Sequence, residues 1–442
     1  MRVHRALGAI LLLSGAFSLT ASNGKGGRDA ASNPFSNGGD TRNMIVVMSD
    51  IHLGADLRYA ECNANLARLE ATIRQIGASR NVKELVIAGD LIDEWFIPAT
   101  VDTYGGKDQA DFVTRVAKAN KGVIDALNMV IKDGKVTVIY IPGNHDLTIS
   151  EANIARILPG IKQARDEGKL GLGTYSPADL PQLAIEHSHR YNFFCAPDPI
   201  SNQDVAPGTI LPPGYFFTRL AALHVVEGKP RPGDAIPVVT KNSSGSASPS
   251  QDLLYAYWGD WAWSLKLFTI SEKYSDKIFT TNIDGFKRTY AVNDFLPYQK
   301  AADGTIAVGL FNGIQDNWAQ RQAANNVAVS IPAARAIALA ASAEESDNQA
   351  INQYFMNPNS DKRIVVFGHT HVPKIIASSN TDGQGTIYAN SGTWIDHNNN
   401  LPTMDFVIVT PQSEEPSSKT TVSLYTYQSK VATKLDEASI RL

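Results

Sequence analysis

Five short apolar segments, each followed at once by residues that can bind a metal ion, constrain the fold of this chain most strongly. The segments cover residues 44–48, 85–88, 136–141, 183–185 and 364–367. Runs of this length and composition are typical of strands that are buried on both faces. The residues that follow them are Ser49-Asp-Ile-His-Leu-Gly54, Gly89-Asp-Leu-Ile-Asp93, Pro142-Gly-Asn-His-Asp146, Glu186-His-Ser-His189 and Gly368-His-Thr-His371. Because ligand sites in open α/β sheets form beyond the carboxyl ends of strands, we expect these residues to converge on one site.

Helical patterns lie between the first three of these strands. In residues 63–76, Leu66, Leu69, Ile73 and Ile76 recur at helical spacing, and residues 112–131 repeat the pattern. The alternation of strands and helices predicts an α/β fold whose sheets are covered by helices. Residues 386–389, 405–410 and 421–427 resemble strands without long helices between them, and we expect them to extend a sheet or pair antiparallel.

The region from about 200 to 350 has a different composition. It contains proline-rich and serine-rich turns, an alanine-rich helical stretch and an aromatic cluster between Tyr255 and Trp263. We interpret it as a helical insertion in a domain that spans residues 44–442. The aromatic cluster fits either a substrate-binding wall or part of the core, and the sequence leaves both possibilities open.

The N-terminus has the pattern of a secretory signal peptide, which we assign to residues 1–21. Residues 1–5 are basic, residues 6–19 are almost entirely apolar or small, and Ala21 offers a small residue for cleavage. The apolar stretch is shorter than the roughly 20 residues that a spanning helix needs, so no transmembrane anchor is expected. This pattern predicts export to the periplasm or the extracellular space. Residues 22–43, rich in Gly, Asn, Ser and Asp, predict a flexible linker.

Charge and cysteine content narrow the function only slightly. The net charge of -4 and the absence of a long basic run make binding to a nucleic-acid polymer unexpected. Cys62 and Cys195 are the only cysteines, and in an exported protein they could form a disulfide. Two unpaired buried thiols are an equally good interpretation.

The motif series resembles that of the calcineurin-like metallophosphoesterase superfamily. That series is Asp-x-His, Gly-Asp, Gly-Asn-His-Asp/Glu, His and Gly-His-x-His, and this chain contains each motif in order between Asp50 and His371. The segment Tyr388-Ala-Asn-Ser-Gly-Thr-Trp394 is also similar to one that often follows the last motif. The resemblance implies an α/β (α+β) fold with two stacked mixed β-sheets flanked by helices, a four-layer sandwich into which the helical insertion is built.

The resemblance also implies seven ligands for two divalent metal ions. One ion would be held by Asp50, His52 and His371, Asp90 would bridge both, and the second ion would be completed by Asn144, His187 and His369. His189 is the alternative to His187, because Ser188 stands where the family often has glycine. Such ligands suit Mn, Fe, Zn or Co and do not choose among them.

The activity implied by the resemblance is hydrolysis of a phosphate mono- or diester by attack of a metal-bridging hydroxide. His145 would protonate the leaving oxygen or stabilise its developing charge, and Asp146 would orient the imidazole of His145. Asp93 and Glu94 could support the ligands or the substrate, although surface or packing roles are slightly favoured.

Other interpretations of the chain remain at this stage. Residues 89–95 resemble the branch of the superfamily that cleaves UDP-diacylglucosamine. That enzyme acts at the cytoplasmic face, whereas this chain is expected to be exported and has a much larger insertion, so we do not transfer the substrate. A metallo-β-lactamase-like hydrolase is disfavoured, because His371 is followed by Val-Pro-Lys and the His-x-His-x-Asp-His string is absent. A metal-binding or non-catalytic protein that retains the fold is the alternative from a different class, and metal analysis would distinguish it.

Overall fold

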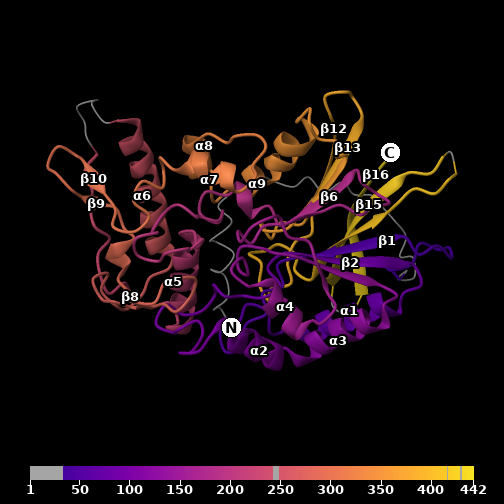
Figure 1. The fold of residues 1–442 in the computed structure, drawn as a ribbon, viewed down its shortest axis with the longest axis horizontal. Helices are drawn as coiled ribbons and strands as arrows, with labels where there is room; N and C mark the ends of the chain where they lie inside the picture. Colours follow the sequence, from indigo (N-terminus) through magenta and orange to yellow (C-terminus); the bar gives the residue numbers. More distant parts are fainter. Residues whose placement is uncertain (1–32, 242–247, 416, 429–430) are drawn as a thin grey trace.

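The computed structural model describes residues 33–241, 248–415, 417–428 and 431–442 (Figure 1). The signal peptide predicted for residues 1–21 lies outside the described residues, as do residues 22–32 of the predicted linker. Among the helices in the described part of the chain, none is both long enough and apolar enough to cross a membrane.

The larger of two main sheets has seven strands in the order β16-β15-β14-β1-β2-β3-β4. β1, β2, β3 and β4 run parallel to one another, whereas β14 pairs antiparallel with β1, and β15 and β16 continue the sheet antiparallel beyond β14. The bounds are β1 (Met44–Met48), β2 (Val82–Ala88), β3 (Thr137–Ile141), β4 (Lys162–Gln163), β14 (Asp405–Thr410), β15 (Thr420–Gln428) and β16 (Val431–Ile440). The sheet is therefore mixed, with the three motif-bearing strands β1, β2 and β3 side by side.

The second sheet has five strands in the order β12-β13-β11-β6-β5. Its bounds are β5 (Thr174–Tyr175), β6 (Leu183–Glu186), β11 (Ile364–Phe367), β12 (Lys374–Ser379) and β13 (Gly385–Asn390). The motif-bearing strands β6 and β11 are parallel neighbours. The strand expected over residues 386–389 extends this sheet as β13, which is parallel to β11. A crossover through β12 returns the chain to the same end of the sheet and allows this parallel pairing.

The two sheets stack face to face, and alternate residues of each strand serve different layers. In β1, Ile45 and Val47 belong to a buried cluster shared with Ile364 and Val366 of β11. The intervening residues, such as Val46, face a second cluster that also includes helix residues. Both faces of the sheet are thus buried, which explains why the strands are continuous apolar runs rather than alternating ones.

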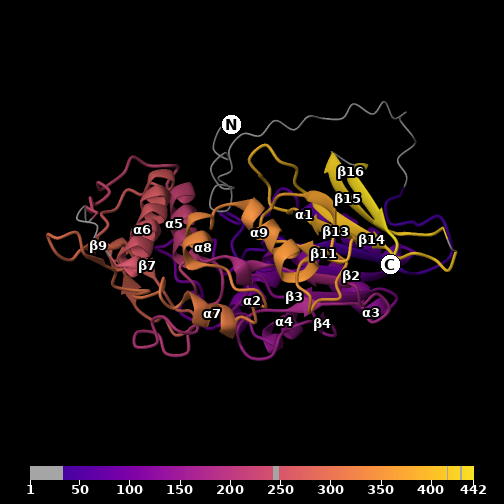
Figure 2. The ribbon, with the colours of Figure 1, turned by 90° about the horizontal axis from the view of Figure 1, so that it is seen from above.

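Helices form the outer layers of the sandwich (Figures 1 and 2). The first sheet is covered by α1 (Leu66–Ala78), α2 (Gln109–Ala119), α3 (Lys121–Asp133) and α4 (Glu151–Ile157). The single helix predicted over residues 112–131 is in fact two helices, because Asn120 leaves the helical region at φ -110° and ψ 36°. The side chain of Asn120 donates a hydrogen bond to the carbonyl of Gly54 at 2.9 Å, which ties this break to the loop after β1.

The region predicted as a helical insertion contains a lobe beside the sheets (Figure 1). Its elements are α5 (Gly214–Val226), α6 (Pro249–Leu267), β7 (Phe279–Thr280), β8 (Thr289–Tyr290), β9 (Tyr298–Gln299), β10 (Ile306–Ala307), α7 (Trp318–Ala324) and α8 (Ala333–Ala338). The next helix, α9 (Ala343–Ala350), covers the second sheet instead, where Asp347 binds Lys374 and the hydroxyl of Tyr388. A π-helical turn, η4 (Ile351–Phe355), leads from α9 towards β11.

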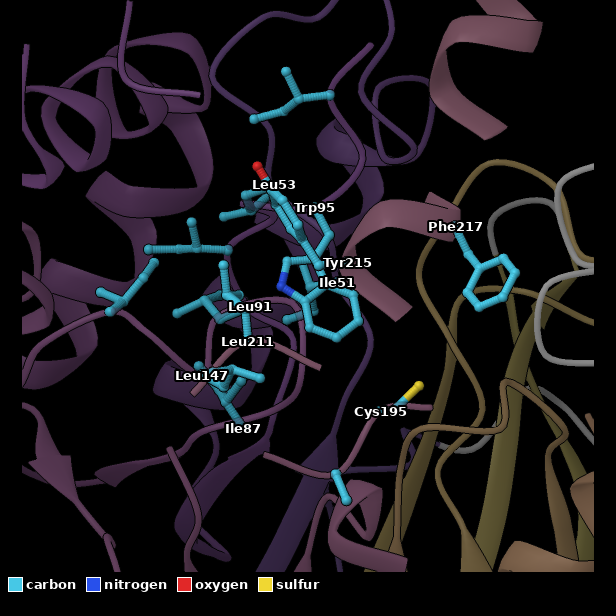
Figure 3. Close-up of a cluster of buried hydrophobic side chains, with 14 of the residues drawn as sticks. Ile51, Leu53, Ile87, Leu91, Trp95, Leu147, Cys195, Leu211, Tyr215 and Phe217 are labelled. Carbon is cyan, nitrogen blue, oxygen red and sulfur yellow. The ribbon is translucent and has the colours of Figure 1, made fainter. Parts of the chain in front are cut away.

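The buried guanidinium of Arg219 in α5 joins this lobe to the loop after β2. It donates to the carbonyls of Ile97 at 2.7 Å, Ala99 at 2.9 Å and Thr280 at 3.1 Å. Figure 3 shows the apolar side of the same junction, where Trp95 lies close to Tyr215. Their ring centroids are 6.3 Å apart.

Residues 33–43, predicted as part of a flexible linker, are anchored on the domain. Phe35 is 1% exposed and stacks on Phe406 with a centroid distance of 5.4 Å. Its carbonyl accepts a hydrogen bond from Ser79 at 2.6 Å. The polar composition of this segment predicts flexibility, but its one phenylalanine, Phe35, is buried in the core.

Candidate metal centre

The loops that follow β1, β2, β3, β6 and β11 meet at one end of the two sheets. The amide of Asp50 donates to the carbonyl of Gly89 at 3.1 Å, and the amide of His52 donates to that of Asp90 at 2.9 Å. The amide of Trp394 in turn donates to the carbonyl of Asp50 at 3.0 Å. These bonds continue the sheet beyond its strands and fix the loops before any ligand is bound.

Five of the seven predicted ligands adopt the left-handed backbone conformation, with φ between 52° and 73°. They are Asp50, His52, Asp90, His369 and His371. Non-glycine residues rarely adopt this conformation, and it is concentrated at functional sites where the surrounding structure enforces it. The strained turns direct successive side chains into the space between the sheets' ends.

All seven predicted ligands form one connected, buried cluster. The contacts between them are His371 Nε2–Asp50 Oδ1 3.1 Å, His187 Nε2–Asp50 Oδ1 3.9 Å, His187 Nε2–Asp90 Oδ2 3.1 Å, His52 Nε2–Asp90 Oδ2 3.6 Å, His187 Nε2–Asn144 Oδ1 3.1 Å and His369 Nδ1–Asn144 Oδ1 2.8 Å. Each of the seven is at most 5% exposed. Residues from five separate loops therefore present their ligand atoms to a common centre.

Each carboxylate is anchored by the backbone. Asp90 Oδ1 accepts the amide of His145 at 2.8 Å, which leaves Oδ2 between His52 and His187. The amide of His369 donates to Asp50 at 3.0 Å. Such anchoring gives a carboxylate one orientation and leaves an oxygen available to a cation.

The pattern of unpaired imidazole nitrogens tests whether these residues fit metal ions. The buried Nε2 atoms of His52 and His369 have no hydrogen-bond partner among the described residues, and that of His371 faces only the carboxylate of Asp50, at 3.1 Å. A buried polar atom without a partner is costly, so such atoms are expected where an ion supplies the missing contact. The ring of His187 donates from Nδ1 to the carbonyl of Ala88 at 2.8 Å, an arrangement typical of metal-binding histidines whose other nitrogen faces the ion. The donor set therefore fits cations.

Two subsets of the cluster have ligand atoms that all lie within 4.8 Å of one another, close enough to hold an ion. One is Asp50, His52 and His371, and the other is Asp50, Asp90 and His187. The first equals the set implied for one ion by the motif resemblance. In the second, Asp50 and Asp90 both lie beside His187, so the geometry offers two carboxylates for sharing between ions, not Asp90 alone.

Glycines bring the loops into close approach. A Cβ on Gly143 would lie 2.1 Å from Asp90 Oδ1, and one on Gly368 would lie 2.8 Å from Asp50 Oδ2. Any side chain at either position would displace a carboxylate of the centre. Gly143 and Gly368 are therefore required because a side chain at either position would occupy the space of a carboxylate.

The electrostatics of the cluster favour bound positive charge. Burial alone would raise the pKa of Asp90, but the charges of His187 and His145 hold it well below its usual value. Burial would lower the pKa of His187, but Asp90 and Asp50 raise it to about 9. The carboxylates are thus ionised and attract positive charge, which divalent ions could supply in place of imidazolium protons.

His187, not His189, faces the centre. The Nε2 atom of His187 lies 3.1 Å from Asp90 Oδ2, whereas the Nε2 atom of His189 lies 3.1 Å from the carbonyl of Gly171. Ser188, between the two histidines, has φ 81°, and both rings are buried. The serine thus takes the conformation for which the family's glycine is suited.

The predicted pairing of Asp146 with His145 is wrong. Asp146 accepts backbone amides instead, from Gly143 at 2.7 Å and from Leu91 at 2.9 Å, and it braces the loops after β2 and β3. The carboxylate that contacts His145 is Asp93, with Oδ1 2.8 Å from His145 Nδ1.

Asp93 also contacts a predicted ligand. Its Oδ2 lies 3.0 Å from His52 Nδ1, so one carboxylate orients both imidazoles. Burial would lower the pKa of His145, but Asp93 and Asp90 raise it to about 10. A surface or packing role for Asp93 is therefore excluded. The sequence did contain a signal, since Asp93 follows Asp90 in the same loop.

Two buried glutamates lie close to these residues. Glu61 Oε2 is 3.3 Å from His52 Nδ1, and no motif in the sequence indicated it. Glu94 accepts hydrogen bonds from Tyr104 at 2.9 Å and from the hydroxyl of Thr148, and it is fully buried. Burial raises the pKa of Glu94 to about 7. Glu94 thus has a packing role, whereas Glu61 supports a ligand.

A pocket opens beside His145 towards the lobe of α5 and α6. Trp95 stacks on His145 with a centroid distance of 4.9 Å, and Trp263 of α6 lines the far part. The aromatic cluster of α6 is therefore divided, because Tyr257 and Trp261 are core residues with no exposed area. Cys195, which also lines the pocket, and Cys62 are both free buried thiols.

The fold and the site together define an α/β sandwich protein with a candidate metal-binding centre at the ends of its strands. Residues 44–210 match the family model described as calcineurin-like phosphoesterase. The match covers less than half of the chain, and it supports membership of the metallophosphoesterase superfamily. The match includes five of the seven predicted ligands, and His369 and His371 lie beyond it. No curated protein sequence matches the chain.

Proposed function

We propose that this protein hydrolyses a phosphate mono- or diester at a centre of two divalent metal ions. The observation that carries the proposal is the connected cluster of seven buried candidate ligands, in which the Nε2 atoms of His52 and His369 have no hydrogen-bond partner among the described residues. A structural ion-pair network would satisfy these nitrogens within the protein. The family match supports the same reaction class.

In this proposal Asp50, His52 and His371 hold one ion, and Asn144, His187 and His369 hold the other, with Asp90 between them. Two bound ions would lower the pKa of a water molecule and bind the phosphoryl oxygens. The neutral amide of Asn144 and the imidazoles limit the negative charge of the ligand set. An anionic phosphate ester is then attracted rather than repelled.

His145 would supply the proton for the leaving group. Hydrolysis forms a bond from the oxygen of water to phosphorus and breaks the bond from phosphorus to the ester oxygen, which departs as an alcohol once protonated. Asp93 fixes the Nδ1 side of His145, which leaves Nε2–H as the donor. The ring of Trp95 covers one face of His145 and keeps water from it.

Export is a separate proposal that rests on the sequence of residues 1–21. Expression of the full chain in a secreting host, followed by mass spectrometry of the mature N-terminus, tests it. Cleavage near Ala21 is expected, and an uncleaved N-terminus in a protein retained by the cells would contradict it.

The direct test of the proposed reaction uses the full chain, stripped of metal and reloaded with manganese. We would compare the hydrolysis of a chromogenic phosphate monoester with that of the matching diester, for the wild type and for Asp90→Asn. Metal-dependent hydrolysis that the variant loses is expected, and the preferred ester would define the substrate class. Bound metal without hydrolysis of either ester would favour the non-catalytic alternative.

A further inference from the structure

The pocket beside His145 is built jointly by the loops after β2 and β3 and by the lobe of α5 and α6. Asn144 and His145 form its inner end, Trp95 one wall, and Phe217, Asp260 and Trp263 the part that the lobe contributes. A substrate with its phosphate at the metal centre would extend into this pocket on the side of the proposed proton donor. The group that lies there is therefore the leaving group.

Two helices are shaped to line this pocket. α5 contributes Gly214, Phe217 and Thr218, and α6 contributes residues 260, 263 and 264, which in both cases is one face at helical spacing. A Cβ on Gly214 would lie 3.1 Å from the ring of Trp95, so the glycine lets α5 approach the site. In Figure 3, Phe217 and Cys195 lie on one side of Trp95, and Leu91 and Leu147 lie on the other. The pocket is on the side of Phe217 and Cys195, which both line it.

Asp260 is the only carboxylate among the residues that line the pocket, and the lining contains no lysine or arginine. Its Oδ2 atom is buried and has no hydrogen-bond partner among the residues that the structure describes. Burial raises the pKa of Asp260 to about 7, with no neighbouring charge offsetting it. Asp260 as a whole is partly buried. A carboxylate oxygen that is removed from water without a partner is costly, so the Oδ2 atom is suited to a ligand that satisfies it.

The sign of this charge restricts the substrate. A carboxylate beside a phosphate site repels an anionic leaving group and disfavours substrates with a second phosphate there. A cationic group would instead pair with Asp260. The surrounding walls are aromatic, from Trp95, Phe217 and Trp263, and aromatic faces attract ammonium groups that have been removed from water.

We propose that the pocket is a subsite for an ammonium group, so that the enzyme selects phosphate esters of a cationic amino alcohol. The inference rests on the proposed phosphoesterase function for the location of the phosphate. The geometry behind it is the unpaired Asp260 carboxylate within an aromatic pocket that opens onto His145.

The first experiment measures binding alone, so that it does not depend on hydrolysis. Calorimetry with the full chain compares choline with its neutral isostere 3,3-dimethylbutanol, for the wild type, Asp260→Asn and Asp252→Asn. Asp252 lies on the same helix but is exposed, which makes it the matched control. We expect the wild type and the control to prefer choline by about tenfold, and Asp260→Asn to lose the preference.

The second experiment compares the hydrolysis of phosphocholine with that of 3,3-dimethylbutyl phosphate by the manganese-loaded protein. A kcat/KM that favours phosphocholine by about tenfold, and falls to parity in Asp260→Asn, supports the inference. Hydrolysis of both esters without a preference would overturn the subsite while leaving the phosphoesterase function intact.

A selective binding of choline without hydrolysis of any ester would have the opposite meaning. The ammonium subsite would then stand and the proposed reaction would fail. Equal binding of choline and 3,3-dimethylbutanol by the wild type would overturn the inference whatever the kinetics.

Discussion

At the scale of single residues, the carboxylate that orients His145 is Asp93 and not Asp146, which the motif order suggests. Asp146 adjoins His145 in sequence but accepts backbone amides, whereas Asp93 reaches both His52 and His145. Adjacent residues on an extended turn point in different directions, so sequence proximity was a poor guide to contact. The partner of the His145 imidazole is Asp93, which lies in the loop after the neighbouring strand β2.

These contacts give variants of Asp93 and Asp146 different expected behaviour. Asp93→Asn should lower kcat about 10²-fold, because it weakens the positioning of His145, and it should also lower the Tm, because Asp93 accepts the amides of Trp95 at 2.8 Å and Phe96 at 2.7 Å. Asp146→Asn should lower the Tm, because it replaces an acceptor of backbone amides. Steady-state kinetics and thermal unfolding of both manganese-loaded variants test this, and an Asp146→Asn variant with normal stability but lost kcat would contradict it.

The unpaired carboxylate of Asp260 should lower stability in a pH-dependent way. Its pKa is about 7 in the folded protein against 3.8 for the ordinary group, so between about pH 4 and 7 the folded state holds a proton that the unfolded state releases. Stability therefore falls as pH rises through this window. The other titratable residues that line the pocket are His145 and Cys195. Both are present in the wild type and in an Asp260→Asn variant, so their titration does not contribute to the difference between the two proteins.

Asp260→Asn should consequently be more stable than the wild type above pH 7, by on the order of 2 kcal/mol, and close to it near pH 4. Thermal unfolding of both proteins at pH 4.5 and pH 8 measures the difference, with Asp252→Asn as the control. A Tm difference that is the same at both pH values would show that Asp260 is not buried as a carboxylate.

The candidate ligands could be predicted from the sequence to a large extent, because each follows directly after a buried strand. Glu61 could not, since it lies in an irregular segment and meets His52 only through tertiary folding. His187 and His189 were separable only once the left-handed conformation of Ser188 was known.

At the scale of elements, strands buried on both faces were predictable because apolar runs end sharply at polar motifs. β12 and β16 were missed, and both lie at sheet edges where many side chains are exposed, so their sequences lack an apolar run. The helix break at Asn120 was hidden, because the apolar periodicity continues across it. The parallel pairing of β13 with β11 could not be predicted, because it depends on the crossover through β12 and not on the composition of β13.

Close approach of the loops after β2 and β3 is a property of these elements that one methyl group should disrupt. Gly143→Ala places a Cβ 2.1 Å from Asp90 Oδ1, and the carboxylate must move away from the centre. We expect the bound manganese to fall from two ions per chain to one or none, measured by elemental analysis after dialysis. Gly259→Ala, in α6 with nothing within 4 Å, is the control and should bind as the wild type does.

Unchanged metal content in Gly143→Ala would show that the loops have room to relax, and that Asp90 is not constrained as the structure indicates.

At the scale of the whole molecule, the lobe of α5 and α6 adds a pocket beside the candidate metal centre. The sequence predicted an insertion but not its pocket, because the lining residues come from segments far apart in the chain. Arg219 holds the lobe to the loop after β2 through several carbonyls. A lysine has no planar fork with which to bridge them.

Arg219→Lys should therefore destabilise the protein by about 2 kcal/mol. Thermal unfolding would compare it with Arg335→Lys, a partly exposed arginine that pairs with Glu345. The control should change the Tm little. Equal Tm values for the two variants would mean that the lobe is held mainly by apolar contacts such as that of Trp95 with Tyr215.

The central claim is that the ends of five strands form a site for two divalent ions. The most direct measurement is the number of manganese ions bound per full-length chain at equilibrium dialysis, quantified by elemental analysis, for the wild type and for Asp90→Asn. The account predicts two ions in the wild type and fewer in the variant. A wild-type chain that binds no metal would contradict the site.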